Sequence, residues 1–316
     1  MSVNPLTSLF GLVVATRNAL YDRGTLPAYR LQGPVVSIGN LSTGGTGKTP
    51  FVLLLGELLK NRGIRFDILS RGYGRQSRGP QIVDPAGSPT DFGDEPLLMA
   101  RRLGVPVVVG EERHAAGLLA ERTFGPQLHL LDDGFQHRAL ARDFDIVLVT
   151  PDDASDRLLP SGRLREPLKS LRRADAVVLT SGTSPDWFPV DGKFIWRIQR
   201  GIAPNDVPQR PVVFCGIARP NTFLLQLRVS GIDPVAQAFY RDHYPYTEKD
   251  IRDLLQLREQ SEAGGFVTTE KDAINLGRYL SALQPLAVVP VTMELLDSAN
   301  AVDTMLRRIA ERKPQA

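Results

Sequence analysis

The glycine-rich segment Ile38–Pro50 constrains the fold of this chain more than any other part of the sequence. It reads IGNLSTGGTGKTP, and it lies between the short apolar run Val35–Ile38 and the helix-like run Thr49–Arg62. Such a loop between a buried strand and a helix collects backbone N–H groups at the helix N-terminus, where the helix dipole also favours anions. The sequence therefore predicts a loop that binds the phosphates of ATP or GTP.

Each residue type in this loop has a physical role beside a phosphate. Glycines allow positive φ and let the backbone approach the ligand closely. Lys48 would reach the β- and γ-phosphates, and the Thr49 hydroxyl would hold Mg²⁺. We therefore assign nucleotide binding to a continuous run of residues, Thr43, Gly44, Gly45, Thr46, Gly47, Lys48 and Thr49.

One position departs from the usual spacing G-x-x-x-x-G-K-[ST], which places a glycine where this chain has Ser42. A glycine-rich turn that carries Gly-Lys-Thr by chance is the alternative interpretation. The order of strand, loop and helix favours the phosphate loop. A dinucleotide-binding fold is disfavoured because no G-x-G-x-x-G opens the following helix.

Apolar strand-like runs alternate with helix-like runs over the first half of the chain. This alternation predicts an α/β fold of the P-loop NTPase type, with a mostly parallel sheet, helices on both faces and ligands at the carboxyl ends of the strands. The strand-like runs after the loop are Arg65–Ser70, Val105–Val109, Leu128–Leu131, Ile146–Thr150 and Ala176–Thr180, and Arg113–Phe124 is helix-like.

Composition divides the remaining chain. Segments rich in Pro, Gly and Asp flank the strand-like run Phe194–Ile198, and a new set of apolar runs starts at Val212–Ile217. Thr247–Leu257 reads as a helix with Thr247 as its cap and Asp250 three residues on. We expect four parts: an N-terminal amphipathic helix in residues 1–30, a P-loop core in 31–185, a linker in 186–210 and a smaller C-terminal α/β domain in 211–316.

Composition and charge exclude several classes of protein. The single cysteine, Cys215, excludes an internal disulfide framework, suits a reducing compartment and reads as a buried thiol. No Cys/His spacing indicates a metal centre, and no aromatic-rich basic surface indicates a nucleic-acid partner. The net charge is only +3, but six Lys and Arg residues gather between Ser155 and Arg173. That basic segment binds an anionic substrate or membrane surface, or it is a solvated face.

The N-terminal run Leu6–Tyr21 places apolar residues at i, i+3, i+4 and i+7, which predicts an amphipathic helix. Arg17 and Asn18 interrupt it, so it is shorter than the roughly 20 apolar residues of a membrane span. It also lacks the basic start of a secretion signal. Two interpretations stay open: the helix lies in the membrane interface with Arg17 reaching the headgroups, or it packs on the protein's own core.

Carboxylates occur at three places that favour phosphate chemistry. Asp132 and Asp133 follow an apolar strand, as does the carboxylate pair that binds Mg²⁺ beside a phosphate loop. Asp94, in a Gly-Asp-Glu-Pro turn, caps a helix or accepts a proton from a substrate hydroxyl. The pair Asp242–His243 would orient or tune such a base, but sequence spacing alone does not bring Asp94 and His243 together.

Several of these segments match one family when they are taken in order. They are Gly39–Asn40 with Gly44–Pro50, Ser70–Gly74, Gly93–Pro96, Asp132–His137, Gly162–Pro167, Asp242–His243 and Thr269–Ala273. The ordered set covers most of the chain and resembles the lipid A 4′-kinases (tetraacyldisaccharide 4′-kinases) of Gram-negative outer-membrane biosynthesis. Family members often carry a second histidine after the first, where this chain has Tyr244.

The resemblance implies a P-loop kinase that uses ATP and Mg²⁺ to phosphorylate the 4′-hydroxyl of a tetraacylated glucosamine disaccharide 1-phosphate. It implies that Asp94 takes the hydroxyl proton as a catalytic pair with His243, beside Lys48. The metal ligands that it implies are Thr49, Asp132, Asp133 and Glu166. The residues that it implies near the substrate are Asn40, Arg71, Gln136, His137 and Arg165.

The same resemblance implies a peripheral or monotopic protein on the cytoplasmic face of the bacterial inner membrane, with the N-terminal helix on an anionic membrane surface. Its partner is then the lipid A disaccharide precursor, and no obligate protein partner is expected. The residues alone leave two other classes open, a nucleotide-switched assembly or chaperone ATPase and a soluble small-molecule kinase. Neither of these needs a lipid-facing helix, and the ATPase needs no base for an acceptor hydroxyl.

Overall fold

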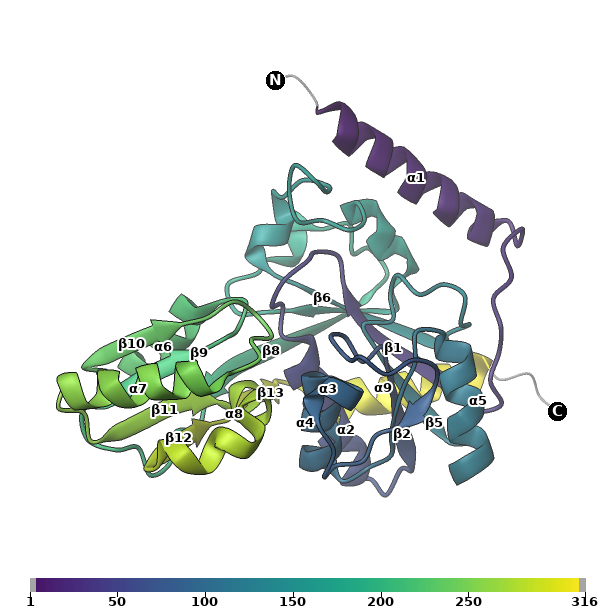
Figure 1. The fold of residues 1–316 in the computed structure, drawn as a ribbon. Helices are drawn as coiled ribbons and strands as arrows, with labels where there is room; N and C mark the ends of the chain where they lie inside the picture. The colour runs from purple at the N-terminus through teal and green to yellow at the C-terminus, as the bar shows by residue number, and fades with distance from the viewer. Residues whose placement is uncertain (1–3, 313–316) are drawn as a thin grey trace.

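The computed structural model describes residues 4–312, which form two sheets with helices packed around them (Figure 1). Within these residues the large sheet has nine strands, in the order β13-β8-β7-β6-β1-β5-β2-β4-β3. Neighbours are parallel except at the two edges, where β3 with β4 and β13 with β8 are antiparallel. The strands are β1 (Val35–Asn40), β2 (Phe66–Ser70), β3 (Gln81–Ile82), β4 (Val107–Val109), β5 (Leu128–Asp132), β6 (Phe144–Val149), β7 (Ala176–Leu179), β8 (Phe194–Ile202) and β13 (Val291–Leu295).

Helices cover both faces of the large sheet, as the sequence predicts. The helices on one face share a core that includes Phe51, Leu97 and Met305; they are α2 (Lys48–Lys60), α4 (Asp94–Leu103) and α9 (Ser298–Arg312). On the other face, α5 (Arg113–Phe124) buries Ala116 against Val35. The 3₁₀ helix η2 (Leu168–Arg173) buries Leu171 in a separate cluster over β6 and β7. Shorter helical turns are α3 (Pro89–Phe92), η1 (Pro151–Ala154) and η3 (Pro185–Trp187).

The small unit is a second α/β layer beside the large sheet. Its strands are all parallel, in the order β10 (Ala236–Phe239), β9 (Pro211–Cys215), β11 (Gly265–Thr269) and β12 (Leu286–Val289). Its helices are α6 (Pro220–Val229), α7 (Glu248–Gln260), α8 (Glu270–Leu276) and the 3₁₀ helix η4 (Gly277–Leu283). Thr247 and Asp250 cap α7 reciprocally, and Cys215 is buried, so both predictions for this region are confirmed.

The chain leaves the large sheet and later returns to it, which composition alone does not predict. β8 lies in the range 186–210 that reads as a linker, yet it extends the large sheet. Its Trp196 is buried, and the centroid of the Trp196 ring lies 6.0 Å from that of Phe144. β13 and α9 then rejoin the large sheet from the C-terminal end of the chain. An apolar run shows that a strand is buried, but not which of two sheets it joins.

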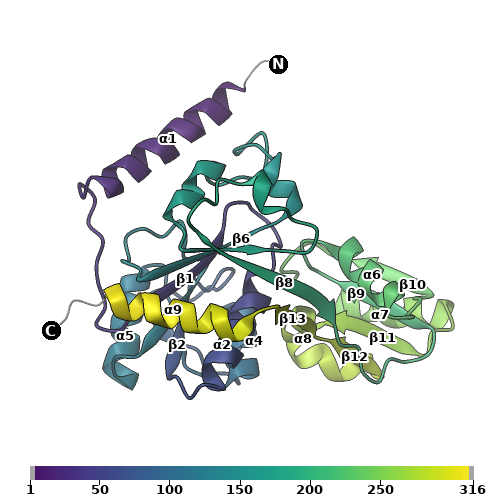
Figure 2. The same ribbon diagram turned by 180° about the vertical axis from the view of Figure 1, so that it is seen from behind.

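α1 (Pro5–Asp22) lies along the outside of the large unit, on the side away from the small sheet (Figures 1 and 2). Four of its apolar side chains, Leu6, Leu9, Leu12 and Val13, are exposed by 62, 58, 64 and 58%. These side chains therefore do not pack on the protein's own core. In the described part of the chain no helix is long and apolar enough to cross a membrane.

Candidate active site

A cavity of about 580 Å³ lies between the carboxyl ends of the large-sheet strands and the small unit. The glycine-rich loop forms one wall together with Asp132 and Asp133, which follow β5. The small unit contributes Arg219, His243 and Lys271 to the opposite wall. Ligands of open α/β sheets bind at this edge, so the cavity is the candidate site.

The glycine-rich loop leads from β1 directly into α2, as predicted. Gly44 and Gly47 have φ of 101° and 90°, which is backbone that only glycine adopts readily, and Gly47 is the N-cap of α2. The helix begins at Lys48, so the free N–H groups of its first turn lie at the loop. These are the donors that a phosphate requires.

Ser42 has a structural reason for not being glycine. It forms an antiparallel bridge with Leu164, and the next residue, Thr43, donates its backbone N–H to the carbonyl oxygen of Arg163 at 2.8 Å. A residue in an extended bridge needs no positive φ. The departure from the usual spacing therefore reflects a loop whose first part is paired with the 163–165 segment.

Lys48 lies between an amide and a carboxylate. Its Nζ donates to Asn40 Oδ1 at 3.0 Å and lies 3.5 Å from Asp133 Oδ1. Arg165 donates to the two carboxylate oxygens of Asp133 at 2.9 and 2.8 Å and also contacts the Asn40 side chain. Gln136 Nε2 donates to the Asn40 backbone oxygen at 3.0 Å. The structure thus brings Lys48 together with four of the residues predicted for metal and substrate.

The two carboxylates after β5 have opposite electrostatic environments. Asp132 is 4% exposed and accepts a hydrogen bond from Ser70 Oγ at 3.0 Å. Burial, with the charges of Glu95 and Asp133, raises the pKa of Asp132 to about 7. Burial acts on Asp133 in the same direction, but Lys48 and Arg165 outweigh it and hold the pKa of Asp133 well below its usual range. Asp133 is therefore the firmly ionised member of the pair.

The residues predicted to hold Mg²⁺ separate into two groups. Thr49, Asp132 and Asp133 all line the cavity and offer a hydroxyl and two carboxylates, which suit Mg²⁺ when phosphate oxygens and water complete the shell. Within residues 4–312 no three acidic, histidine or cysteine side chains form a metal site by themselves. Glu166 lies elsewhere: Arg173 donates to both its oxygens at 2.8 and 2.9 Å. The structure places Glu166 at the contact with α1, not among the cavity carboxylates.

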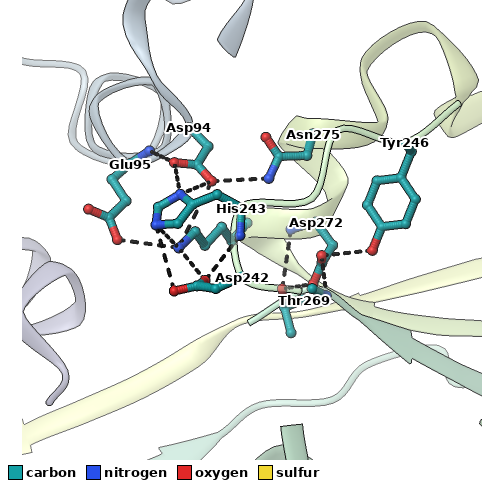
Figure 3. Close-up of polar contacts among 10 residues, drawn as sticks. Asp94, Glu95, Asp242, His243, Tyr246, Thr269, Asp272 and Asn275 are labelled. Carbon is teal, nitrogen blue, oxygen red and sulfur yellow. Dashed lines mark hydrogen bonds and ion pairs between the residues drawn. The ribbon is translucent and has the colours of Figure 1, made fainter. Parts of the chain in front are cut away.

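Asp94 and His243 meet between the two units (Figure 3). His243 Nδ1 is 2.9 Å from each carboxylate oxygen of Asp94, although the residues are 149 positions apart in the sequence. Asp94 begins α4, and His243 lies in a turn before α7 with a φ of 56°. Left-handed backbone at a histidine costs on the order of 1 kcal/mol, so the surrounding fold must hold this turn in place.

The histidine, and not the carboxylate, faces the cavity. Asp94 is 4% exposed, whereas the His243 side chain is 23% exposed and lines the cavity wall. Burial acts against the Asp94 charge, but the hydrogen bond from His243 and the charge of Lys271 lower the pKa of Asp94 overall. Burial alone would lower the pKa of His243, but the hydrogen bond and charge of Asp94 outweigh burial, so the pKa of His243 is raised overall. An imidazole held by a carboxylate is the arrangement of a general base.

His137 lies in an electropositive neighbourhood. Burial and the charges of Arg113, Arg142, Arg17 and Arg71 lower its pKa to about 4. Arg71, which the family resemblance implies near the substrate, lines the cavity, and His137 lies outside its lining. A neutral imidazole among guanidinium groups marks a place where an anionic group of a ligand would be stabilised.

Four basic side chains of the segment between residues 155 and 173 form ion pairs with carboxylates of the protein itself. The ion pairs are Arg163 with Asp156, Arg165 with Asp133, Arg172 with Asp22 and Arg173 with Glu166. Two of these arginines, Arg172 and Arg173, bind residues that belong to or contact α1. Through Arg165, Arg172 and Arg173 the segment connects the cavity carboxylate Asp133 with α1.

Three residues on the cavity or beside it were not predicted as site residues from the sequence. Lys271 and Asn275, on α8, contact His243 and Asp94, respectively. Lys271 belongs to a segment that matches the family, and this match with the i, i+4 spacing is the signal that could have found the pair. Arg200 of β8 lines the cavity, and its Nη1 lies 3.9 Å from where a Cβ on Gly47 would be. No sequence signal marks Arg200.

Known proteins share both this fold and this sequence. The model of the tetraacyldisaccharide-1-P 4′-kinase family matches residues 1–310. The chain is 51% identical to the tetraacyldisaccharide 4′-kinase of Koribacter versatilis, over 98% of this chain and 100% of that protein. It is 37% identical to the enzyme of that name from Geobacter metallireducens, over 94% and 95%. LpxK from Aquifex aeolicus, solved in complex with ATP, superimposes with a TM-score of 0.80 at 37% identity, over 96% of this chain and 97% of that one. The expected fold class is confirmed.

Proposed function

The chain belongs to the tetraacyldisaccharide-1-P 4′-kinase family, and we propose that the cavity between its two sheets is where this kinase acts. The reaction is the ATP-dependent phosphorylation of the 4′-hydroxyl of a tetraacylated glucosamine disaccharide 1-phosphate in lipid A biosynthesis. The observation that supports the cavity best is that it holds a phosphate loop and a carboxylate-bound imidazole together. A kinase needs the first for its donor and the second for its acceptor.

The phosphates of ATP would lie on the loop formed by residues 43–49. The N–H groups at the start of α2 and the Lys48 ammonium would offset the charge that the γ-phosphoryl group carries in the transition state. Thr49, Asp132 and Asp133 would hold Mg²⁺, which when bound withdraws charge from the phosphate oxygens. Arg165 and Lys48 keep Asp133 ionised for that task.

The Asp94–His243 pair would take the proton of the sugar hydroxyl. With Nδ1–H of His243 directed at Asp94, Nε2 is the ring atom left for the cavity. The 4′-oxygen bonds to the γ-phosphorus, the bond from that phosphorus to the oxygen of ADP breaks, and the hydroxyl proton passes to Nε2. The Asp94 carboxylate then stabilises the imidazolium, so the two residues act as one unit.

The anionic 1-phosphate of the substrate would lie near Arg71 and His137. The charges of Arg17 and Arg113 also act on His137, so the neighbourhood of His137 is positively charged. Three other residues assigned to the substrate, Asn40, Gln136 and Arg165, bind one another and support Lys48 and Asp133. We assign them to framing the site next to the sugar.

α1 would lie in the anionic cytoplasmic surface of the inner membrane. Its exposed apolar side chains suit the boundary between headgroups and acyl chains. Arg17 contacts the carbonyl oxygen of Gln136 instead of extending away from the body, so the helix lies close to His137 and the arginines around it. A substrate with four acyl chains could then present its sugar while its chains stay in the bilayer.

The division of the chain into domains would follow the two sheets. Residues 31–202 with 291–312 would form the kinase core, and residues 211–289 the smaller unit. The pairing of β8 with β13 at the edge of the large sheet supports this division over a linker at 186–210.

An assay of purified protein with Mg-ATP and the tetraacyl disaccharide 1-phosphate tests these assignments. Phosphorylated lipid that forms in equal amount to ADP, and that disappears in Lys48→Ala, supports them. ATP hydrolysis that is indifferent to the lipid would instead favour a nucleotide-switched ATPase. Transfer that Lys48→Ala retains would remove the loop from the donor site.

A further inference from the structure

Lys271 lies at the centre of the contacts around His243. It is in the first turn of α8, and its side chain is 16% exposed. Its Nζ is 3.1 Å from His243 Nε2, 3.1 Å from Asp242 Oδ1 and 3.5 Å from Glu95 Oε1. An ammonium group has three N–H donors and no acceptor, so these three contacts account for all of its hydrogen-bonding capacity.

The contact with Nε2 restricts how the imidazole is protonated. Lys271 can only donate, so Nε2 must offer a lone pair, and a ring proton must then be on Nδ1. Nδ1 lies 2.9 Å from both oxygens of Asp94, which require a donor there. The two neighbours of the ring, Lys271 and Asp94, therefore demand the same tautomer.

α8 holds both members of the proposed catalytic pair. Asn275 lies one turn after Lys271, on the same face of the helix, and its Nδ2 donates to Asp94 Oδ2 at 3.0 Å (Figure 3). The start of α8 is fixed by the buried Asp272, which accepts hydrogen bonds from the Gly216 N–H at 2.7 Å and the Tyr246 hydroxyl at 2.8 Å. The helix thus carries a rigidly placed ammonium to Nε2.

We propose that Lys271 is a positioning residue that holds His243 with its proton on Nδ1 and its lone pair on Nε2, ready to receive the proton of the acceptor hydroxyl. This inference rests on the proposed function, in which His243 is the base. When the hydroxyl approaches Nε2, Lys271 can release the ring and keep Asp242 and Glu95 as partners. The ammonium would then also lie beside the oxygen that becomes the nucleophile.

The charges around His243 give the sign of the expected pH effect. The groups that face the ring are Asp94 from α4, Asp242 from its own turn, Lys271 from α8 and the Tyr73 ring at 5.1 Å, and Glu95 of α4 pairs with Lys271 beside them. The carboxylates favour a doubly protonated imidazole, and Lys271 opposes it. Removal of the Lys271 charge should therefore raise the pKa of His243.

Nitrogen NMR of ¹⁵N-histidine-labelled wild-type protein tests the tautomer without any activity. The chain has four histidines, and His243→Gln assigns the signal. Through a pH titration, the neutral form of His243 should carry its proton on Nδ1, and Lys271→Met should titrate about one pH unit higher. A neutral form with its proton on Nε2, or an unshifted titration in Lys271→Met, would overturn the proposal.

Kinetics test the consequence for the reaction. The acidic limb of kcat/KM against pH should move up by about one unit in Lys271→Met, which lowers kcat/KM about tenfold below that limb, with the KM for ATP little changed. Lys271→Gln retains a donor without the charge and should move the acidic limb by the same amount. It therefore provides the test if Lys271→Met folds poorly. Lys249→Met, at an exposed lysine of α7, should shift nothing. An unmoved limb in both Lys271 variants would overturn the proposal. If His243→Gln keeps near-normal turnover, the proposed base is wrong, and the NMR result still decides the tautomer.

Discussion

Asn18 of α1 donates a hydrogen bond to Glu166 Oε2 at 2.8 Å, and both side chains are buried. Glu166 follows Arg165, which holds both carboxylate oxygens of Asp133. One buried contact therefore connects the helix that exposes its apolar face to the segment that fixes a cavity carboxylate. Arg138 adds a second link, because it donates to the Asn18 carbonyl oxygen at 2.9 Å.

Replacing Asn18 by alanine should loosen α1 from the body. A hydrogen bond to a buried carboxylate contributes about 2 kcal/mol, and Asn18→Ala should lower the free energy of unfolding by that amount. Limited proteolysis should also cut faster between α1 and β1. Thr16→Ala, at an exposed position of the same helix, is the matched control. An Asn18→Ala protein that unfolds and digests like this control would show that the contact does not hold the helix.

Arg165→Lys should impair the reaction although it keeps the charge. Lysine cannot donate to both oxygens of Asp133 in the forked geometry that arginine provides. Loss of a residue that orients a metal-binding carboxylate lowers activity or metal affinity by about tenfold to a hundredfold. Turnover measured against Mg²⁺ concentration should show this loss. Arg163→Lys, a neighbouring arginine that pairs with Asp156, is the control. Equal kinetics for the two variants would show that Arg165 does not act by orienting the Asp133 carboxylate.

Asp94→Asn should lower kcat by about a thousandfold and change the KM for ATP little. The amide can donate to Nδ1 and so favours the opposite tautomer of His243, which is the effect of the same change in other carboxylate–histidine pairs. Steady-state kinetics at several ATP concentrations separate the two parameters. Asp91→Asn, at an exposed position just before α4, controls for the loss of a charge in this region. Near-normal turnover in Asp94→Asn would mean that the proton leaves by another route.

Local sequence signals predict the donor half of the site, because its parts are consecutive. The glycines, Lys48 and Thr49 all lie in one loop, so their roles beside a phosphate can be read from the local sequence. Ser42 is the exception, because only its bridge to the distant Leu164 explains it. The same holds for most strands, whose apolar runs are buried in the sheets.

The acceptor half depends on the tertiary fold, which is why the residues alone left it open. Asp94 and His243 come from different units, and from the sequence only the family resemblance predicted that they pair. Glu166 shows the opposite case: only the family resemblance implied metal binding for it, and in the structure Arg173 and Asn18 bind its two carboxylate oxygens. Which partner a buried carboxylate finds is decided by packing between distant segments.

The exposed apolar face of α1 should determine membrane binding. Leu9→Glu places a charge where a 58%-exposed leucine would enter the interface, and should weaken binding to anionic lipid vesicles by about tenfold or more. Flotation of the purified protein with vesicles measures this. Leu225→Glu on α6, where the leucine is 61% exposed, is the matched control and should bind normally. Equal binding of both variants would show that another surface meets the membrane.

The buried His129 should make stability depend on pH in a predictable direction. Its Nδ1 is 2.7 Å from Asp67 and its Nε2 3.3 Å from Glu121, and all three side chains are almost fully buried. Burial lowers the pKa of His129, but the hydrogen bond and charge of Asp67, with Glu121, raise it overall. A raised pKa in the folded state adds stability that is complete below the unfolded value of about 6.5 and is lost as pH rises through the folded value.

His129→Asn removes the partner of two buried carboxylates, so it should lower the free energy of unfolding by about 3 kcal/mol in mild acid. The difference from wild type should shrink as the pH rises, because neutral His129 no longer offsets the charges of Asp67 and Glu121. Urea unfolding of both proteins at several pH values measures this difference and cancels the titration of groups outside the His129, Asp67 and Glu121 cluster. His114→Asn is the control, since His114 stacks on Tyr29 and has no carboxylate partner in the described residues. A difference that grows with pH would contradict the assigned charge of His129.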